Sequence, residues 1–179
     1  LLVTSWTEAP AAIATLAHST HCTAPSHPDL AHWLAVNALD EAAVINLGPV
    51  PYALLGQVLR GVAVAVFAQR CEPGINPTLL ASFACGVPTI LSNNTGHQPF
   101  VQQNLGFPLQ FQRPVTPNSE MGTSGWGESD VEELVELLEY IYTQRQTAQC
   151  RGLAATDSVQ SWQWQTQLAQ WRSHWGSKA

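Results

Sequence analysis

A carboxylate, a glycine turn and an Asn-Pro pair lie close together in the segment RCEPGINPTLLASFACGVP, residues 70–88. Asn followed by Pro is favoured at the N-cap and first turn of a helix, so we expect a helix to begin at Pro77 and to end before Gly86. The apolar run before it, residues 62–69, predicts a buried strand. Strand, turn and helix start together direct unpaired backbone N–H groups to the carboxyl end of a parallel sheet, where α/β proteins bind anionic ligands.

The chemistry of this turn suits a nucleotide sugar. The backbone N–H groups and the partial positive charge of a helix start match a diphosphate. Glu72 opposes an anion placed directly on it, but it accepts hydrogen bonds from hydroxyl groups a few ångströms away, such as those of a sugar. The alternative is that Glu72 is a solvated loop carboxylate and that Gly74 only turns the chain. The residues alone leave both interpretations open.

Two more candidates lie near the same expected edge. His97 follows the sequence NNTG at the end of a predicted strand and is a candidate donor contact, although a surface or helix-start histidine is the simpler interpretation. Arg70 is the nearest cation and a candidate phosphate ligand, and again a surface residue is the simpler interpretation. Four further histidines crowd one region but match no compact zinc motif, so we expect no metal site and no other cofactor: His18, His21, His27 and His32.

The elements that must position these residues alternate between strand-length apolar runs and helical patterns. We expect about five strands in one parallel sheet, at residues 1–6, 43–47, 62–68, 87–92 and 107–111. Helices are expected at residues 9–18, 28–38, 51–60, 77–85, 130–149 and 158–174, the fifth opening with a capping box of Ser129 and Glu132. Residues 112–129, with several Pro and Gly, predict a long loop. The predicted class is α/β, with a doubly wound, Rossmann-like parallel sheet and helices on both faces.

The composition limits both the fold and the partners. The chain of 179 residues is 45% hydrophobic, so we expect a single domain over residues 1–179. The formal net charge of -6 and the single lysine, Lys178, argue against nucleic acid as a partner. We recognise no apolar run long enough to span a bilayer and no secretory signal pattern. Because the four cysteines show no paired spacing, we expect reduced thiols and a cytoplasmic location, including the inner face of a membrane.

The segment CEPGINPTLLASFACGVPTILSNNTGH, residues 71–97, resembles the donor-binding motif of retaining, two-domain glycosyltransferases of the GT-B type, the glycosyl transferases group 1 family. The preceding AAVINLGPVPYALLGQVLRGVAVAVFAQ, residues 42–69, is similar to the family's strand, LG-V loop, short helix and buried strand. With the later capped helix and the C-terminal helix, the resemblance covers residues 1 to about 175. Residues 71–96 are its specific part, and the rest is general α/β patterning.

The resemblance implies a set of donor-binding residues. It implies that Glu72 contacts the donor sugar and that the loop from Val50 to Tyr52 lies against the nucleotide base. The backbone of the turn and helix start is implied to lie beside the sugar and the diphosphate: Gly74, Ile75, Asn76 and Thr78. In the family a second Glu binds the ribose hydroxyls, and Ala81 stands at that position here.

On this resemblance we expect the nucleotide-sugar-binding C-terminal half of a glycosyltransferase, which transfers a glycosyl group from a nucleotide diphosphate sugar to an acceptor hydroxyl. Because the chain opens directly on LLVTSW, we expect a fragment without its N-terminal acceptor domain and without the family's basic phosphate-binding residues. Such a fragment is expected to be inactive alone, and no catalytic residue is identified. The alternatives are a non-catalytic domain that has lost donor binding, which Ala81 favours, and another GT-B-like enzyme such as a sugar-nucleotide epimerase or a phosphorylase.

Tryptophans mark the expected C-terminal helix. Trp164, Trp171 and Trp175 repeat at intervals of seven and four residues, which places them on one helical face. We therefore expect this face, together with Trp162, to pack in a core or at a domain interface rather than to form a sugar-stacking platform. Without a partner domain, the fragment is expected to self-associate through this helix or to bury it.

Overall fold

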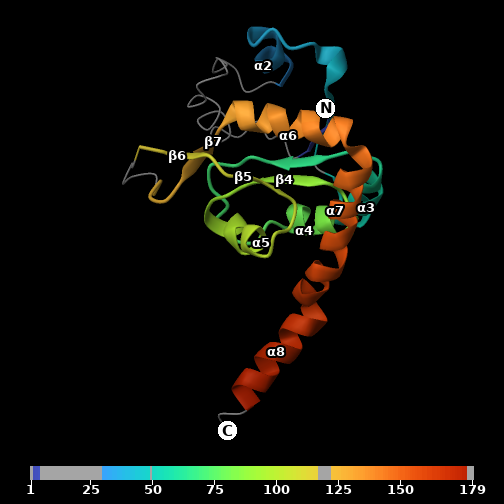
Figure 1. Ribbon diagram of the computed structural model, residues 1–179, viewed down its shortest axis with the longest axis vertical. Helices are drawn as coiled ribbons and strands as arrows, with labels where there is room; N and C mark the ends of the chain where they lie inside the picture. The colour runs from blue at the N-terminus through green and yellow to red at the C-terminus, as the bar shows by residue number, and fades with distance from the viewer. Residues whose placement is uncertain (1, 5–29, 49, 117–121, 177–179) are drawn as a thin grey trace. The chain divides into compact units, whose positions relative to one another are not determined.

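The computed structural model describes residues 2–4, 30–48, 50–116 and 122–176 (Figure 1). Contacts between residues divide the chain into two compact units, Leu1–Leu54 and Leu55–Ala179. Within the described residues we find no helix that combines the length and the apolar composition of a membrane-spanning segment.

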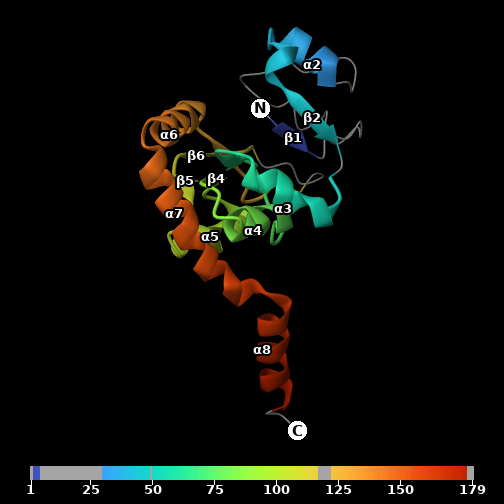
Figure 2. The ribbon, with the colours of Figure 1, turned by 90° about the vertical axis from the view of Figure 1, so that its right-hand side faces the viewer.

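The first unit contains a short parallel sheet. Strand β1 (Leu2–Thr4) pairs with β2 (Ile45–Gly48), and the two lie side by side in Figure 2. Helix α2 (Leu30–Val36) and a short 3-10 helix (Glu41–Ala43), capped by Asp40, precede β2. Both predicted strands are found, in shortened form, and α2 lies within the predicted helix at 28–38. The helix expected at residues 9–18 lies outside the described residues.

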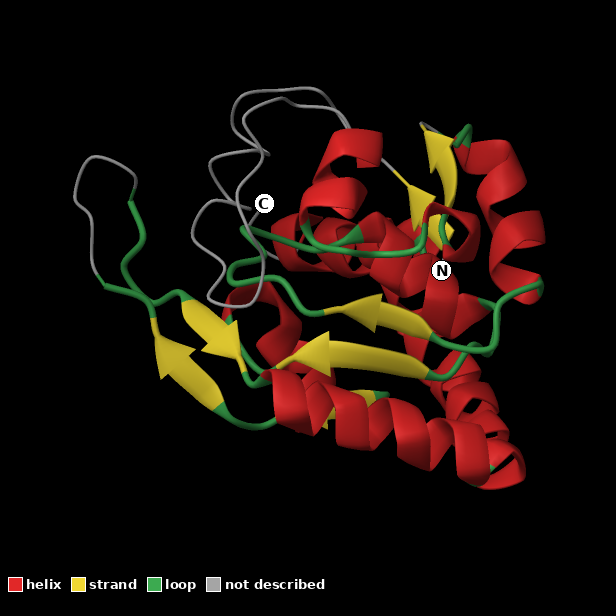
Figure 3. Ribbon diagram, turned by 90° about the horizontal axis from the view of Figure 1, so that it is seen from above, coloured by secondary structure: helices red, strands yellow, loops and turns green. Residues whose placement is uncertain are grey.

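The second unit is built on a parallel sheet with the order β3-β4-β5. Figure 3 shows strands of this sheet in yellow, with helices in red around them. Its strands are β3 (Ala65–Phe67), β4 (Thr89–Ser92) and β5 (Phe107–Leu109). Helix α3 (Tyr52–Arg60) leads into this unit, α4 (Pro77–Ala84) connects β3 to β4, and a 3-10 turn (Thr95–His97) with α5 (Gln98–Gln102) connects β4 to β5. Because the strands are parallel, the loops after β3 and β4 leave the sheet at the same edge.

Helices cover both faces of the three-stranded sheet. Leu91 of the central strand belongs to a core with residues of α4, α5 and the later helix α7, including Phe83, Phe100 and Ala155. Its neighbour Ile90 belongs to the core on the other face, with residues of β5 and α6. Alternate residues of a strand point to opposite faces, so two buried neighbours require a layer on each side. The coarse prediction of an α/β fold with a parallel sheet is confirmed for this unit.

The strand pairing differs from the predicted single five-stranded sheet. The five predicted strands are all present, but β1 and β2 form one parallel sheet while β3, β4 and β5 form another. The predicted loop at 112–129 is also corrected, because it contains an antiparallel pair, β6 (Gln112–Pro114) and β7 (Gly127–Ser129). A hydrogen bond from Gln112 Nε2 to Ser129 Oγ joins this pair at 2.9 Å. Three-residue strands beside Pro and Gly carry too little periodicity to be recognised from sequence.

The long helix predicted at 130–149 is two helices, α6 (Val131–Thr143) and α7 (Arg145–Ser158). Gln144 separates them with φ -109° and ψ 46°, outside the helical region. The N-cap is Asp130 rather than Ser129: Asp130 accepts from the N–H groups of Glu132 and Glu133 at 2.9 and 3.2 Å. Glu133 instead turns its carboxylate to the backbone N–H groups of Gln110 and Phe111, at 2.8 and 3.0 Å. Helix α6 is thereby fixed to the end of β5.

The tryptophan face is packed only at its beginning. Trp162, in a 3-10 turn (Val159–Trp162), lies against the core, with its ring 5.1 Å from that of Phe100. In the following helix α8 (Trp164–Gly176), Trp164, Trp171 and Trp175 are exposed. The expectation of core packing is therefore wrong for these three residues within the described chain, because α8 presents them to solvent.

Candidate functional site

Two loops meet at the carboxyl ends of β3 and β4. The N–H of Glu72, after β3, donates to Thr95 Oγ1 at 2.7 Å, and the N–H of Gly96, after β4, donates to the carbonyl of Glu72 at 2.9 Å. Gly96 lets them approach, because a Cβ there would press on the carbonyl oxygen of Gly74 and lie 2.7 Å from that of Glu72. The absence of a side chain at Gly96 therefore allows the close contact that sets the position of Glu72.

Asn76 connects Glu72 to the start of α4. Its Oδ1 accepts from the N–H groups of Thr78 and Leu79 at 3.0 and 3.1 Å, so the predicted N-cap is confirmed. Its Nδ2 donates to Glu72 Oε2 at 2.9 Å. Among the described residues the other carboxylate oxygen, Oε1, has no hydrogen-bond partner, and the side chain is 15% exposed. Glu72 therefore keeps one oxygen for a ligand.

Backbone N–H groups without a partner among the described residues follow this carboxylate in the chain. No described residue accepts a hydrogen bond from the N–H of Gly74, Ile75 or Asn76, and the first two residues are exposed. The N–H of Thr78 is already taken by Asn76, and Pro77 has none. The turn can thus donate to an anion through residues 74–76 while Glu72 Oε1 accepts from a neighbouring hydroxyl.

His97 lies beneath Glu72 and is fully buried. Its Nδ1 is 2.9 Å from Ser92 Oγ, and its ring meets that of Phe67 edge to face. Its Nε2 has no hydrogen-bond partner and lies 3.9 Å from Glu72 Oε2. Burial lowers the pKa of His97 from its ordinary value of 6.5, against the raising effects of the Glu72 charge and of Ser92.

A buried amide holds the sheet edge together around these loops. Asn94 Nδ2 donates to the carbonyl oxygens of Gln69 and Gly127 at 3.0 Å and to Gln112 Oε1 at 2.9 Å, which links β4 to the ends of β3, β6 and β7. Arg70 donates to Glu128 Oε1 at 2.7 Å. The cation nearest to the turn is therefore engaged by a carboxylate of β7.

The structure brings together part of the predicted set. Glu72, Gly74, Ile75, Asn76 and Thr78 form the turn and helix start, and His97 lies against Glu72. Ala81 is half-buried one turn into α4. Val50 and Tyr52 belong to the first unit, where Tyr52 is exposed at the start of α3. Gly86 has φ +69°, the left-handed conformation predicted after the helix end.

Sequence reasoning missed the residues that fix the two loops: Ser92, Asn94, Thr95, Gly96 and Glu128. The signal for the first four was present in the run SNNTG, because polar residues and a glycine directly after a buried strand indicate a constrained turn. Glu128 had no such signal, since its pairing with Arg70 joins residues 58 positions apart.

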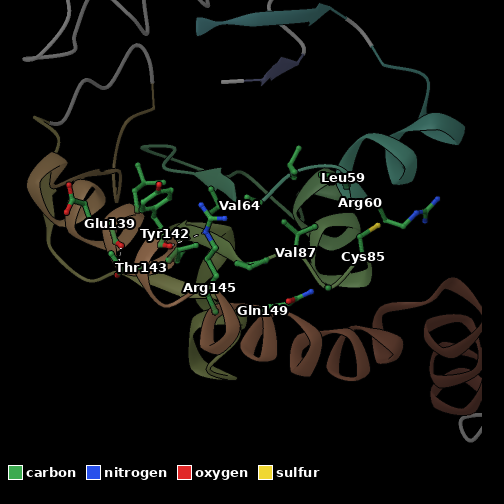
Figure 4. A pocket seen from close by; sticks show the side chains of 17 residues that line it. Leu59, Arg60, Val64, Cys85, Val87, Glu139, Tyr142, Thr143, Arg145 and Gln149 are labelled. Atoms are coloured by element: carbon green, nitrogen blue, oxygen red, sulfur yellow. Dashed lines mark hydrogen bonds between the residues drawn. The ribbon is translucent and has the colours of Figure 1, made fainter.

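A hollow of about 960 Å³ lies at the other end of the strands. It is lined by residues before β3 and β4 together with α3, α6 and α7 (Figure 4). The lining is largely apolar, and the guanidinium of Arg145 lies 4.6 Å from the centre of the Tyr142 ring. We therefore identify the candidate site by the polar groups of the loops after β3 and β4, and not by this hollow.

No described group of three or more His, Cys, Asp or Glu side chains is arranged to hold a metal ion. Three of the crowded histidines, His18, His21 and His27, lie outside the described residues. Cys71, Cys85 and Cys150 are free thiols. No protein-family model matches the chain, and no curated protein matches it significantly.

Proposed function

We propose that the turn after β3 binds a nucleotide diphosphate sugar, and that the chain is the donor-binding C-terminal half of a retaining glycosyltransferase. The observation that carries the proposal is the presence, among the described residues, of an acceptor and of donors without partners within five residues of the chain. Glu72 Oε1 is without a partner, and the N–H groups of Gly74, Ile75 and Asn76 lie directly after it in the chain. A ligand that carries hydroxyls next to a diphosphate satisfies both.

The charged and the uncharged parts of the ligand contact different groups of the protein. The diphosphate takes hydrogen bonds from residues 74–76 and the partial positive charge of α4, while Glu72 accepts from hydroxyls of the sugar. During transfer to an acceptor hydroxyl the diphosphate leaves with increased negative charge, which fixed backbone donors stabilise without reorganisation. The protein contribution proposed here is positioning of the donor and stabilisation of the leaving group.

The same proposal includes a doubly wound arrangement of the sheet and a location in the cell. The covered sheet of the second unit would be part of a doubly wound, Rossmann-like sheet that binds the donor at its carboxyl edge. The chain would act in the cytoplasm, including the inner face of a membrane.

Three observations favour a second candidate, a non-catalytic domain that has lost donor binding. Ala81 stands where the resembled family has the ribose-binding Glu. The N–H groups of Thr78 and Leu79 are occupied by Asn76, and the guanidinium of Arg70 is engaged by Glu128. Each of these reduces the number of groups available to a nucleotide.

Titration with UDP, UDP-glucose, GDP and GDP-mannose, followed by backbone amide NMR shifts, separates the two candidates. Donor binding predicts shifts centred on residues 74–76 and high-micromolar to millimolar affinity, because only a few hydrogen bonds are available. Glu72→Gln should weaken the nucleotide sugar more than the bare nucleotide, and Glu132→Gln, an exposed residue on α6, is the matched control. If none of the four ligands shifts residues 72–80 at several millimolar, the non-catalytic candidate is correct.

A further inference from the structure

The pair formed by His97 and Glu72 carries an inference about how the sugar is held. His97 is fully buried, yet its Nε2 has no hydrogen-bond partner and lies 3.9 Å from Glu72 Oε2. Buried polar atoms without a partner are rare in folded proteins, and where they occur near a binding residue they point to a role.

The contacts around Ser92 fix the orientation of the His97 ring. His97 Nδ1 lies 2.9 Å from Ser92 Oγ, which in turn lies 3.3 Å from Asn94 Oδ1; which of His97 and Ser92 donates depends on the tautomer of the ring. Asn94 is oriented by its own three acceptors, which keeps Oδ1 on the side of Ser92. In either tautomer the neutral ring carries no charge, and Nε2 faces Glu72 Oε2 at 3.9 Å without a hydrogen bond.

Protonation of the neutral ring converts this arrangement into an ion pair. Among the described residues the groups that face His97 are Glu72 from the loop after β3, Ser92 from β4 and the apolar ring of Phe67 from β3. Glu72 is the charged one, and its charge favours protonation while burial opposes it. The protonation of His97 is therefore coupled to the carboxylate of Glu72 and to little else on these elements.

We propose that His97 is a positioning residue whose protonation sets how strongly Glu72 accepts hydrogen bonds from sugar hydroxyls. The inference rests on the proposed function, in which Glu72 is the sugar-binding carboxylate. When His97 is neutral, Asn76 alone contacts Glu72 Oε2. Glu72 Oε1 then accepts a hydrogen bond from a sugar hydroxyl with the full charge of the carboxylate. With charged His97, the imidazolium draws that charge toward Oε2, and the hydroxyl bond weakens.

The first experiment tests the coupling without any ligand. The imidazole resonances of His97 are titrated by NMR in the wild type, in Glu72→Gln and in the control Glu132→Gln. We expect His97 to titrate below 6.5, its ordinary value, and the Glu72→Gln variant to titrate at still lower pH because the favourable charge is gone. An unchanged His97 titration in Glu72→Gln overturns the inference.

The second experiment tests the consequence for the sugar. The ratio of affinities for UDP-glucose and UDP is measured from pH 8 down through the observed pKa of His97, in the wild type and in His97→Gln. The terminal phosphate of UDP itself titrates near pH 6, by analogy with other phosphate monoesters, so the informative quantity is the difference between the two proteins. We expect the wild-type ratio to fall by about two- to tenfold relative to the variant as His97 becomes charged.

The outcomes distinguish the two proposals. Parallel pH profiles in the wild type and His97→Gln overturn the role of His97 and leave nucleotide-sugar binding in place. If UDP-glucose and GDP-mannose both fail to bind, the proposed function fails and the role in sugar binding fails with it, while the ligand-free titration still reports whether His97 and Glu72 are coupled. Should His97→Gln not fold, Ser92→Ala replaces it, because it changes one partner of the ring and keeps Glu72; the pH at which the affinity ratio falls should then move together with the titration of His97, and a ratio that does not follow that titration overturns the role of His97.

Discussion

Arg70 and Glu128 form an ion pair of 2.7 Å that ties the loop after β3 to β7. Their side chains are 15% and 25% exposed, so solvent screens the pair only in part. The pairing sets the charge beside the candidate site, because the cation nearest to the turn is opposed by a carboxylate. A diphosphate would have to compete with Glu128 for this guanidinium.

Replacing Glu128 by Gln should therefore strengthen diphosphate binding. Gln has nearly the same shape as Glu but no charge, so Arg70 becomes a better partner for phosphate. We expect UDP to bind about two- to tenfold more tightly, the equivalent of one hydrogen bond. Calorimetry at low ionic strength measures the change, and Glu136→Gln, exposed on α6, controls for net charge. Equal affinities of the two variants would remove Arg70 from the proposed site.

Ala81→Glu should restore a contact to ribose. Ala81 is half-buried on α4, about one turn beyond the helix start, and in the resembled family a Glu at this position accepts from the ribose hydroxyls. Each added hydrogen bond contributes about 0.5–1.5 kcal/mol, so UDP affinity should rise about two- to tenfold. Ala84→Glu, at an exposed position of the same helix, should have no effect. No difference between the two variants would favour the non-catalytic domain.

The local elements of the site were predicted from the sequence more accurately than the contacts between those elements. The Asn76 cap, the helix start at Pro77 and the left-handed Gly86 follow from rules that act over a few residues, and all three are confirmed. The division into two sheets, the β6–β7 pair and the contact between Arg70 and Glu128 depend on residues far apart in the chain. No local propensity specifies such contacts, which is why they were missed.

The burial of His97 could not be predicted from the local sequence either. Its place after NNTG predicted a surface or helix-start histidine; the structure places it at the start of α5 but buries it completely. The 3-10 turn of Thr95–His97 directs the ring back under Glu72, and Ser92 fixes its Nδ1. Burial of this kind depends on the packing of β3 against β4, so it is visible only once the sheet is assembled.

The stability of the protein should decrease in mild acid because of His97. Burial lowers the pKa of His97 in the folded state, so below about 6.5 the unfolded chain binds this proton more tightly than the folded chain does. The free energy of unfolding should therefore fall as the pH drops from 6.5 through the folded-state pKa. Urea titrations of the wild type and His97→Gln measure this slope, and the variant should lack the His97 contribution. Identical pH profiles would contradict the buried environment of the ring.

Helix α8 should mediate weak self-association. Trp164, Leu168, Trp171 and Trp175 are exposed and are spaced by four, three and four residues, the spacing of a coiled-coil seam. Identical seams are complementary, so the expected occupant is α8 of a second copy. The helix has only 13 residues, so we expect a weak, concentration-dependent dimer in sedimentation experiments. The double variant Trp171→Gln, Trp175→Gln should be monomeric, unlike the control Arg172→Ala, and a wild type that is monomeric at all concentrations would refute the contact.

Gly96 and Gly74 offer a matched pair that tests the geometry of the two loops. A Cβ on Gly96 would press on the backbone carbonyl of Gly74 and lie 2.7 Å from that of Glu72, whereas a Cβ on Gly74 would meet nothing within 4 Å. Backbone cannot move aside as a side-chain tip can, so Gly96→Ala should push the two loops apart and break the hydrogen bond from the Gly96 N–H to Glu72. We expect Gly96→Ala to lower the free energy of unfolding by about 1–3 kcal/mol, and Gly74→Ala to change it by less than about 0.5 kcal/mol.

Because Glu72 would move with its loop, Gly96→Ala should also shift the titration of His97 in NMR spectra, while Gly74→Ala should leave that titration unchanged. If both variants are equally stable and His97 titrates alike in both, the close approach of the two loops is not what holds Glu72 over His97.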